Sequence, residues 1–184
     1  GVLRTVDKRT HQPLYETPIT TILNADIPVT REGVVACPGV TGGVLWSSPA
    51  YHPGEKILLT SSIDYCSRFR AANNVRFIPG QLYMGGNARH EGDMSGWITA
   101  VEVESGEVRW KYQTEFPNVA AVTTTAGGLA ISGTLAGDLL FFDVATGEVL
   151  NSIATGAQIG GGNISYAVDG KQHVQILHRN VVDQ

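Results

Sequence analysis

A repeated pattern of fifteen residues constrains the fold of this chain more than any other feature of its sequence. Three segments align without a gap: Gly1–Tyr15, Gly96–Trp110 and Gly137–Asn151. Each opens with glycine, continues as an alternating apolar run, and carries an acidic residue six positions after that glycine, namely Asp7, Glu102 and Asp143. A Ser-Gly or Thr-Gly pair closes two of the runs, and Thr10-His11 is the degenerate copy. Alternation with period two, ending in a turn that accepts positive φ, predicts a β-hairpin in each segment.

The spacing of these repeats predicts the architecture. Gly96 and Gly137 lie 41 positions apart, within the range of about 40–50 residues expected for a four-stranded propeller blade. Gly1 and Gly96 lie 95 positions apart, which fits two blades plus an insertion. Three further strand–turn–strand patterns supply the second hairpin of each unit, at 48–62, 124–134 and 165–177. Because helical periodicity is nearly absent, we expect an all-β chain that forms a partial β-propeller of about three to four blades, each a four-stranded antiparallel sheet.

The predicted propeller segments cover the chain, 1–184, as a single domain. They are a blade remnant, an insertion, two blades and a set of closing strands, at 1–22, 23–43, 44–113, 114–153 and 154–178. The aromatic residues that end two repeats, Tyr15 and Trp110, should pack against the neighbouring sheet, whereas Asn151 in the third repeat should make only a weak contact. Since an open arc of blades leaves strand edges unpaired, we expect either a portion of a longer polypeptide or a chain that needs a partner.

Composition and charge exclude two classes of function. Lys and Arg number 13 against 17 for Asp and Glu, so the formal net charge is −4. The sequence has no run of basic residues that could neutralise a nucleic-acid backbone. No segment approaches the ~18 apolar residues of a membrane-spanning helix. We therefore expect no nucleic-acid binding and no membrane span.

The two cysteines, Cys37 and Cys66, are 29 positions apart. Neither belongs to a Cys-x-x-Cys pair or a Cys/His cluster, so a thiolate metal site is disfavoured. A disulfide between them is favoured, with a free reactive thiol as the alternative. A disulfide would indicate an oxidising compartment, either the periplasm or the exterior of the cell.

Few other residues suggest chemistry on their own. The five histidines have no ligand spacing and are expected in turns or at the surface: His11, His52, His90, His173 and His178. The glycines at 160–162 lack the Lys of a phosphate loop and fit strands that crowd near a propeller axis. Asn163 opens a glycosylation sequon within a predicted strand. Trp46 is either a core residue or part of a central channel, where a planar ligand would stack on it.

Six stretches, in order and over nearly the whole chain, carry a resemblance to a known family. They are TPITTI at 17–22, CPGVTGGVLWSSPAYHP at 37–53, IDYC ending at Cys66, GWITAVEVESGEVRW at 96–110, TAGGLAISGTLAGDLLFFDVATGEVL at 125–150 and YAVDGKQHVQI at 166–176. Together they resemble the C-terminal part of the quinoprotein alcohol dehydrogenases, the pyrroloquinoline-quinone (PQQ) enzymes built on an eight-bladed propeller. The block at 37–53 with its second cysteine makes the resemblance specific, because single blades occur in many propellers.

The resemblance implies an oxidoreductase whose catalytic and metal-binding residues lie outside this chain. In this family PQQ lies at the propeller axis, stacked on a Trp beneath a disulfide of adjacent cysteines, with Ca²⁺ or a lanthanide held by carboxylate and amide side chains. A carboxylate base takes the alcohol proton while a hydride passes to the quinone. The segments that supply the metal ligands, the base and the adjacent cysteines lie upstream of the part matched here. We therefore expect no catalytic residue and no metal ligand in this chain, which on its own should not be a competent dehydrogenase.

The resemblance also implies partners and three cofactor contacts. The partners are the rest of the propeller, a small alcohol or sugar substrate, and a cytochrome or quinone that accepts electrons. Trp46 matches the family, whereas Leu45 stands where methanol-dehydrogenase-like members carry Asn, and Val119 stands where they carry Trp. These three residues are expected to face the cofactor channel. The spacing of Cys37 and Cys66 matches that of a cysteine pair which is a disulfide in the family.

Two other functions remain open at this stage. The loss of polar contacts at positions 45 and 119 motivates a non-catalytic propeller of the same lineage, acting as a scaffold or binding protein. A carbohydrate-binding propeller would need exposed aromatic platforms in its loops. The available candidates lie near an expected long loop at 64–80 and are Tyr65, Phe69 and Phe77.

Overall fold

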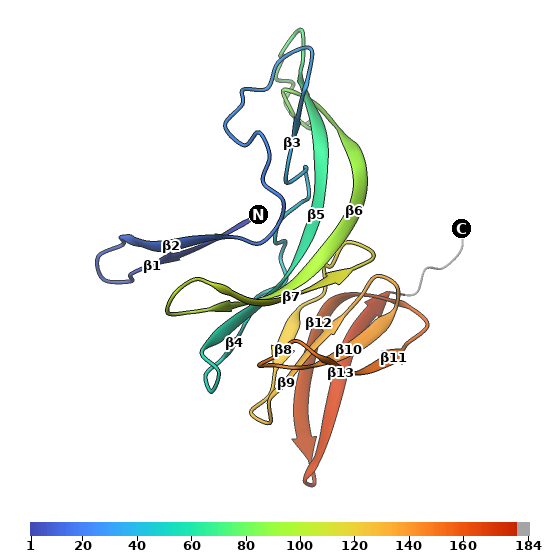
Figure 1. Ribbon diagram of the computed structural model, residues 1–184. Helices are drawn as coiled ribbons and strands as arrows, with labels where there is room; N and C mark the ends of the chain where they lie inside the picture. The colour runs from blue at the N-terminus through green and yellow to red at the C-terminus, as the bar shows by residue number, and fades with distance from the viewer. Residues whose placement is uncertain (180–184) are drawn as a thin grey trace.

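The computed structural model describes residues 1–179, which contain β-strands and no helix (Figure 1). The strands in chain order are β1 (Val2–Val6), β2 (Pro13–Pro18), β3 (Val34–Ala36), β4 (Ala50–His52), β5 (Ile57–Ala71), β6 (Gly86–Glu102), β7 (Val108–Thr114), β8 (Val122–Thr124), β9 (Leu129–Gly133), β10 (Asp138–Asp143), β11 (Val149–Ala154), β12 (Gln158–Val168) and β13 (Lys171–Arg179). All strand pairs are antiparallel. The all-β prediction is confirmed.

Two of the sheets have the order expected of propeller blades. Strands β8, β9, β10 and β11 form one sheet in which each strand pairs with the next along the chain. Strands β4, β5, β6 and β7 form the other in the same order, with β3 added beside β5. The hairpins β1-β2 and β12-β13 form separate two-stranded sheets at either end of the row. The structure is therefore an open arc of successive sheets.

Each repeat of the sequence forms the hairpin predicted for it. The turns place Gly106 at φ 78° and Gly147 at φ 75°, and in the degenerate copy His11 takes φ 59°. In two of the hairpins the repeated acidic residue closes the turn, because Asp7 accepts hydrogen bonds from the backbone N–H of Arg9 and Thr10, and Asp143 does the same for the residues at 145 and 146. These bonds lower the pKa of both carboxyl groups.

The third acidic residue of the repeat, Glu102, has a different role. Its carboxylate accepts a hydrogen bond of 2.6 Å from Arg109 Nε, and the same guanidinium reaches Glu55 at 2.8 Å. The Arg109 side chain thereby ties the β6-β7 hairpin to the turn between β4 and β5. The hydrogen bond from Arg109 lowers the pKa of Glu102.

Adjacent sheets pack face to face and bury their apolar side chains. The larger core lies between the two complete blades: Ile57, Leu59, Ile98 and Ala100 from one, and Val122, Ala130, Leu140, Phe142 and Val144 from the other. A second core lies beyond it and consists of Ala120, Ile131, Leu139 and Ile159. Strand β10 contributes to both cores because its successive side chains point to opposite faces of the sheet.

A recurrent contact joins neighbouring blades at their outer hairpins. The ring of Tyr15 lies on Gly106, and its hydroxyl donates to the Val103 carbonyl at 2.9 Å. The ring of Trp110 lies in the same way on Gly147 and donates to the Val144 carbonyl at 3.0 Å. The prediction that these two aromatic residues pack on the neighbouring sheet is confirmed. Asn151, at the equivalent place in the third repeat, is exposed and accepts a bond from its neighbour Ser152.

The contact of Tyr15 with Gly106 corrects the reading of the 95-residue spacing. The β1-β2 hairpin lies directly beside the sheet that contains β6 and β7, so no further blade fits between Gly1 and Gly96. The interval holds one blade, and the remaining length forms an arm. The expectation of two blades plus an insertion was therefore wrong.

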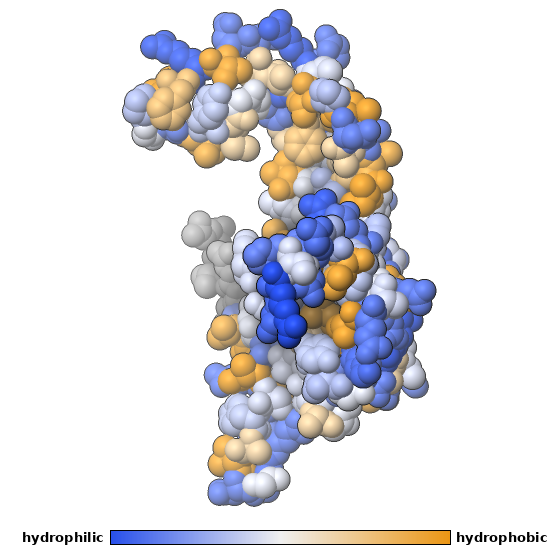
Figure 2. Space-filling model, turned by 90° about the vertical axis from the view of Figure 1, so that its left-hand side faces the viewer, coloured by the Kyte–Doolittle hydropathy of each residue, from blue (hydrophilic) through white to orange (hydrophobic). Residues whose placement is uncertain are grey.

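The arm is formed by β5 and β6, which continue together past the end of the blade (Figure 1). It begins at an irregularity in the register between Asp64 and Cys66, and β3 lies along it. The Cys37–Cys66 disulfide joins the segment before β4 to the base of the arm, as predicted. The arm curves away from the blades and leaves an open hollow on one side (Figure 2).

The expected loop at 64–80 is also corrected. Residues up to Ala71 belong to β5, and the connection to β6 runs from 72 to 85. Tyr65 is buried and Phe69 is half-buried, whereas Phe77 is 67% exposed in the connection. Only one of the three proposed aromatic platforms is therefore available, which removes the main support for a carbohydrate-binding propeller.

Candidate functional site

The innermost strands of the arc lie side by side, and this arrangement locates the axis. The hydroxyl of Thr124 in β8 donates to the Tyr51 carbonyl in β4, and that of Thr123 donates to the Asn163 carbonyl in β12. The three strands thus come from three successive sheets. The residues that immediately precede these strands therefore lie together at one end of the axis.

Two loops at this end bring the predicted cofactor contacts together. Leu45 and Trp46 lie in the loop that precedes β4, and Val119 lies in the loop that precedes β8. The Ser47 hydroxyl, from the first loop, donates a hydrogen bond to the Val119 carbonyl in the second. We call this end of the axis the mouth; it is formed by Leu45, Trp46, Ser47 and Val119.

The mouth presents an aromatic face and two apolar side chains. Trp46 is 78% exposed, so within the described residues it is not part of a core. Leu45 and Val119 are half-buried. None of these three side chains offers a hydrogen-bond donor apart from the indole N–H of Trp46. The mouth can therefore stack and shield a planar ring, but Leu45 and Val119 offer no side-chain donor for the polar edge of a ligand.

A groove of about 350 Å³ adjoins Val119. Its other lining residues are Leu135, Gln158, Gly160, Gly161, Leu177 and His178. A Cβ at position 160 would lie 3.1 Å from Val119 Cγ2, and one at 161 would lie 2.7 Å from Leu177 Cβ. Two of the three glycines at 160–162 are thus needed where strands crowd at the axis, whereas Gly162 faces open space.

Buried polar residues hold the loop that carries Val119. The Ser61 hydroxyl donates to the Ala120 carbonyl, and the Asn163 amide donates to the Ala121 carbonyl at 2.7 Å. Asn118 is 2% exposed and accepts a bond of 3.1 Å from the backbone N–H of Ala120. Sequence reasoning missed these positioning residues. The one available signal was the sequon at Asn163, whose side chain is 5% exposed and already bound within the protein.

The environment of His52 also differs from the sequence-based expectation. It is buried at the opposite end of β4, where its Nδ1 accepts a hydrogen bond from the Glu55 N–H at 3.1 Å. The proton must therefore be on Nε2, which lies 3.2 Å from the Thr125 carbonyl and donates to it. His52 connects two blades, so the expectation that all five histidines lie in turns or at the surface was wrong for this residue.

A carboxylate lies where the arm meets the blade, and its contacts show a structural role. Asp64 accepts hydrogen bonds from Trp97 Nε1 at 2.7 Å and from the Thr21 N–H at 3.0 Å. The Lys111 ammonium lies 4.1 Å from the centre of the Trp97 ring and donates to the Ile19 carbonyl. Burial lowers the pKa of Lys111, and the charge of Asp64 opposes that shift. The cluster fastens the base of the arm to segment 19–21.

The described residues contain no cluster of three or more His, Cys, Asp or Glu side chains arranged to hold a metal ion. Over residues 1–179 the structure also contains no helix long and apolar enough to cross a membrane.

Successive antiparallel sheets whose first strands, β4, β8 and β12, lie side by side around one axis define part of a β-propeller. No protein-family model matches the chain. It is 29% identical over 157 residues to the lanthanide-dependent methanol dehydrogenase of Methylacidiphilum fumariolicum strain SolV, over 80% of this chain and 26% of that protein. It is 27% identical over 167 residues to the quinoprotein ethanol dehydrogenase of Pseudomonas aeruginosa, over 81% of this chain and 27% of that protein.

The solved structures agree with these relatives. A europium-containing methanol dehydrogenase matches 93% of this chain and 34% of its own length, with a TM-score of 0.80 and 25% identity. A quinohemoprotein alcohol dehydrogenase from Pseudomonas putida HK5 matches 97% of this chain and 31% of its own length, with a TM-score of 0.86 and 15% identity, which bears on the fold alone. The resemblance to the quinoprotein alcohol dehydrogenases is confirmed. The chain spans about a quarter of the length of these curated relatives.

Proposed function

We propose that the chain is the C-terminal part of a PQQ-dependent dehydrogenase that oxidises an alcohol or a sugar, and that it forms one wall of the cofactor channel. The observation that carries this proposal is the hydrogen bond from the Ser47 hydroxyl to the Val119 carbonyl, because it joins the two loops that the family resemblance assigns to the cofactor. The similarity to methanol and ethanol dehydrogenases supports the same conclusion.

Three residues of the mouth would contact the cofactor in this proposal. The exposed indole of Trp46 provides a flat surface on which the fused rings of PQQ would stack. Leu45 and Val119 would pack against the cofactor and exclude water, which strengthens electrostatic interactions within the channel. When bound, PQQ supplies the electrophilic quinone carbon that accepts a hydride. The residues present suit the ring faces of the cofactor, and its polar edges would be bound by residues outside this chain.

The remaining machinery belongs to a longer protein in this proposal, which we call the parent. Ca²⁺ or a lanthanide would be held by ligands outside the chain, as would the catalytic base. The other blades of the parent would complete the propeller around the predicted segments at 1–22, 44–113, 114–153 and 154–178. A small alcohol or sugar would be the substrate, and a cytochrome or quinone would accept the electrons. The disulfide at Cys37 and Cys66 favours a periplasmic or secreted location.

The parent protein provides the test. It should be produced without cofactor, reconstituted with PQQ and either Ca²⁺ or a lanthanide, and assayed for dye-linked oxidation of alcohols and aldoses. We expect activity that requires both the cofactor and the metal. PQQ binding should be measured separately by equilibrium dialysis, because a parent that binds PQQ without turning over the tested substrates retains the channel but acts on another substrate.

A non-catalytic propeller is the second candidate. It is favoured by Leu45 and Val119, whose side chains have no hydrogen-bond donors for a quinone. A parent that binds no PQQ under any metal condition would support this candidate and contradict the dehydrogenase. The upstream sequence distinguishes them as well, because adjacent cysteines and a set of acidic metal ligands are expected only in the enzyme.

A further inference from the structure

One face of the arm concentrates positive charge that the linear sequence does not reveal. In the β5-β6 ladder, Arg68 lies directly opposite Arg89, and Arg70 lies opposite Asn87. Since side chains alternate between the faces of a strand, Arg68, Arg70, Asn87 and Arg89 share one face. Two guanidinium groups in directly opposed positions repel each other, so this ladder is destabilised unless negative charge lies nearby.

The chain compensates this charge only in part. Glu91 accepts two hydrogen bonds from Arg68, at 3.1 and 2.8 Å, and this pairing lowers the pKa of Glu91. Among the described residues, no ion pair involves Arg70 or Arg89. Segment 65–90 contains four arginines and no Asp or Glu, although the whole chain has a net charge of −4. The face is therefore an isolated basic patch on an acidic protein.

The basic patch is concave, and the backbone at Gly33 packs against the Arg70 side chain. A hollow of about 240 Å³ is lined by Arg68, Arg70, Asn87, Arg89, His90 and Glu91. Gly33, at φ 99°, lies beneath Arg70, and a Cβ at position 33 would fall 2.8 Å from Arg70 Cγ. Only glycine permits this approach without strain. The Arg70 stem is thus supported by the backbone, which reduces the entropy lost when its head group binds a ligand.

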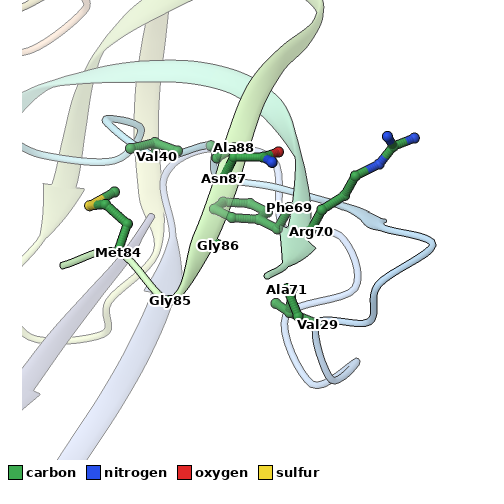
Figure 3. A pocket seen from close by; sticks show the side chains of 11 residues that line it. Val29, Val40, Phe69, Arg70, Ala71, Met84, Gly85, Gly86, Asn87 and Ala88 are labelled. Atoms are coloured by element: carbon green, nitrogen blue, oxygen red, sulfur yellow. The ribbon is translucent and has the colours of Figure 1, made fainter. Parts of the chain in front are cut away.

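The opposite face of the arm has a different character. A groove of about 460 Å³ there is lined by apolar side chains, among them Val29, Val40, Phe69, Ala71 and Met84, and its rim includes Arg70 and Asn87. Figure 3 shows the Arg70 side chain running away from Phe69 and Met84, toward the other face. Along β5 the apolar Phe69 and Ala71 thus alternate with the basic Arg68 and Arg70, and Arg70 lies between the apolar groove and the basic hollow. The surface of the arm is therefore not uniformly polar, and its positive charge is concentrated in the hollow beside Arg68, Arg70 and Arg89.

We infer that the Arg68, Arg70, Asn87 and Arg89 face of the arm is a binding site for a phosphate-type oxyanion, either free or as a lipid headgroup. Planar guanidinium groups donate paired N–H bonds that match the oxygens of such an anion. The anion would supply the negative charge that Arg70 and Arg89 lack, since Glu91 pairs only with Arg68. The Asn87 amide would add a neutral donor.

Titration of the protein with inorganic phosphate at low ionic strength tests the site. The side-chain Nε–Hε signals of Arg70 and Arg89 should shift and saturate in a ¹H–¹⁵N spectrum. Arg89→Gln should weaken binding by about tenfold, because it removes one charge-assisted pair of hydrogen bonds. Arg4→Gln is the matched control, since it removes an exposed guanidinium paired with Glu16 on the distant β1-β2 hairpin. It should bind phosphate as the unmodified protein does.

Thermal unfolding gives a second measurement that also reports whether the variants fold. A ligand that binds the native state raises the melting temperature by mass action. Phosphate should therefore stabilise the unmodified protein and the Arg4→Gln variant more than the Arg89→Gln variant. Since general salt effects act on all three proteins alike, only the difference among them counts.

Vesicles distinguish the two sources of the anion. Sedimentation with phosphatidylglycerol vesicles, but not with phosphatidylcholine vesicles, would assign the site to a headgroup, and phosphate binding without sedimentation would assign it to a free anion. Phosphate shifts that do not saturate, or that are equal in the Arg89→Gln and Arg4→Gln variants, together with no vesicle binding, would overturn the inference. This outcome is independent of whether the parent binds PQQ.

Discussion

The indole of Trp110 lies flat against Gly147 of the next blade, so close that a Cβ at position 147 would fall 2.5 Å from the ring. The same pair of elements is joined by the bond from Trp110 Nε1 to the Val144 carbonyl. Tyr15 and Gly106 repeat this arrangement one blade earlier. The contact therefore joins neighbouring blades in the same way at two places, and the repeated glycine serves both the turn and the interface.

Gly147→Ala should destabilise the protein by about 2–4 kcal/mol, since the new methyl group meets both an unfavourable φ and the Trp110 ring. Gly156→Ala is the matched control: its φ of 76° is nearly that of Gly147, but nothing lies within 4 Å of its Cβ position. That variant should lose only about 1 kcal/mol. Urea unfolding measures both values, and equal losses would show that the ring contact contributes nothing.

The Cys37–Cys66 disulfide should stabilise the insertion and the arm. In the chain-entropy model its loop is worth about 3–4 kcal/mol. The double variant Cys37→Ala/Cys66→Ala should lose stability of this order, and limited proteolysis should cut segment 23–43 before the blades. Thiol titration of unfolded, unreduced protein provides the direct check. Two reactive thiols would contradict the bridge.

Acid should destabilise the outer hairpins through Asp7 and Asp143. Their folded-state pKa values lie below those of the unfolded chain because backbone N–H groups bond to the charged carboxylates. This stabilisation is thus complete above a pH of about 4 and is lost as the pH falls through the folded-state values.

Urea unfolding of Asp143→Asn at neutral and acidic pH isolates this effect. The variant should be less stable than the unmodified protein at neutral pH, and the difference should shrink as the pH falls. Asp7→Asn should behave alike at the equivalent turn. A difference that stays constant from neutral to strongly acidic pH would exclude the proposed linkage.

Much of this fold could be predicted because its determinants are local. The hairpins follow from alternation, a turn glycine and a capping carboxylate within fifteen residues, and the aromatic contacts follow from the repeat itself. The arm could not be predicted in this way. The register between β5 and β6 shifts between Asp64 and Cys66, and the segment beyond it was expected to be a loop, although Arg68 and Arg70 alternate there with Phe69 and Ala71 as in a strand.

The mouth was predictable only in part. The resemblance named Leu45, Trp46 and Val119, but the residues that position them act across long separations. Ser47 reaches Val119 over 72 positions, and Asn163 reaches Ala121 over 42. A single sequence carries no periodic signal for such pairs. The opposed arginines at 68 and 89 were hidden for the same reason, since only the strand register brings them together.

Leu45→Asn in the parent tests the difference from the methanol-dehydrogenase-like pattern. An amide at this position would supply the hydrogen-bond donor that Leu45 lacks, so PQQ should bind about three- to tenfold more tightly. Leu45→Met keeps an apolar side chain of similar volume and should leave the affinity unchanged. Equilibrium dialysis measures both. An equal change in the two variants would indicate that side-chain packing, and not a donor, controls affinity.

The affinity of the parent for PQQ, with Trp46→Ala compared against Phe77→Ala, tests the central claim most directly. Both variants remove an exposed aromatic side chain, but Trp46 lies at the mouth and Phe77 lies in the connection at the end of the arm. Loss of the stacking surface should weaken PQQ binding by about tenfold or more for Trp46→Ala, with no change for Phe77→Ala. Unaltered PQQ affinity in the Trp46→Ala parent would contradict the assignment of the mouth to the cofactor channel.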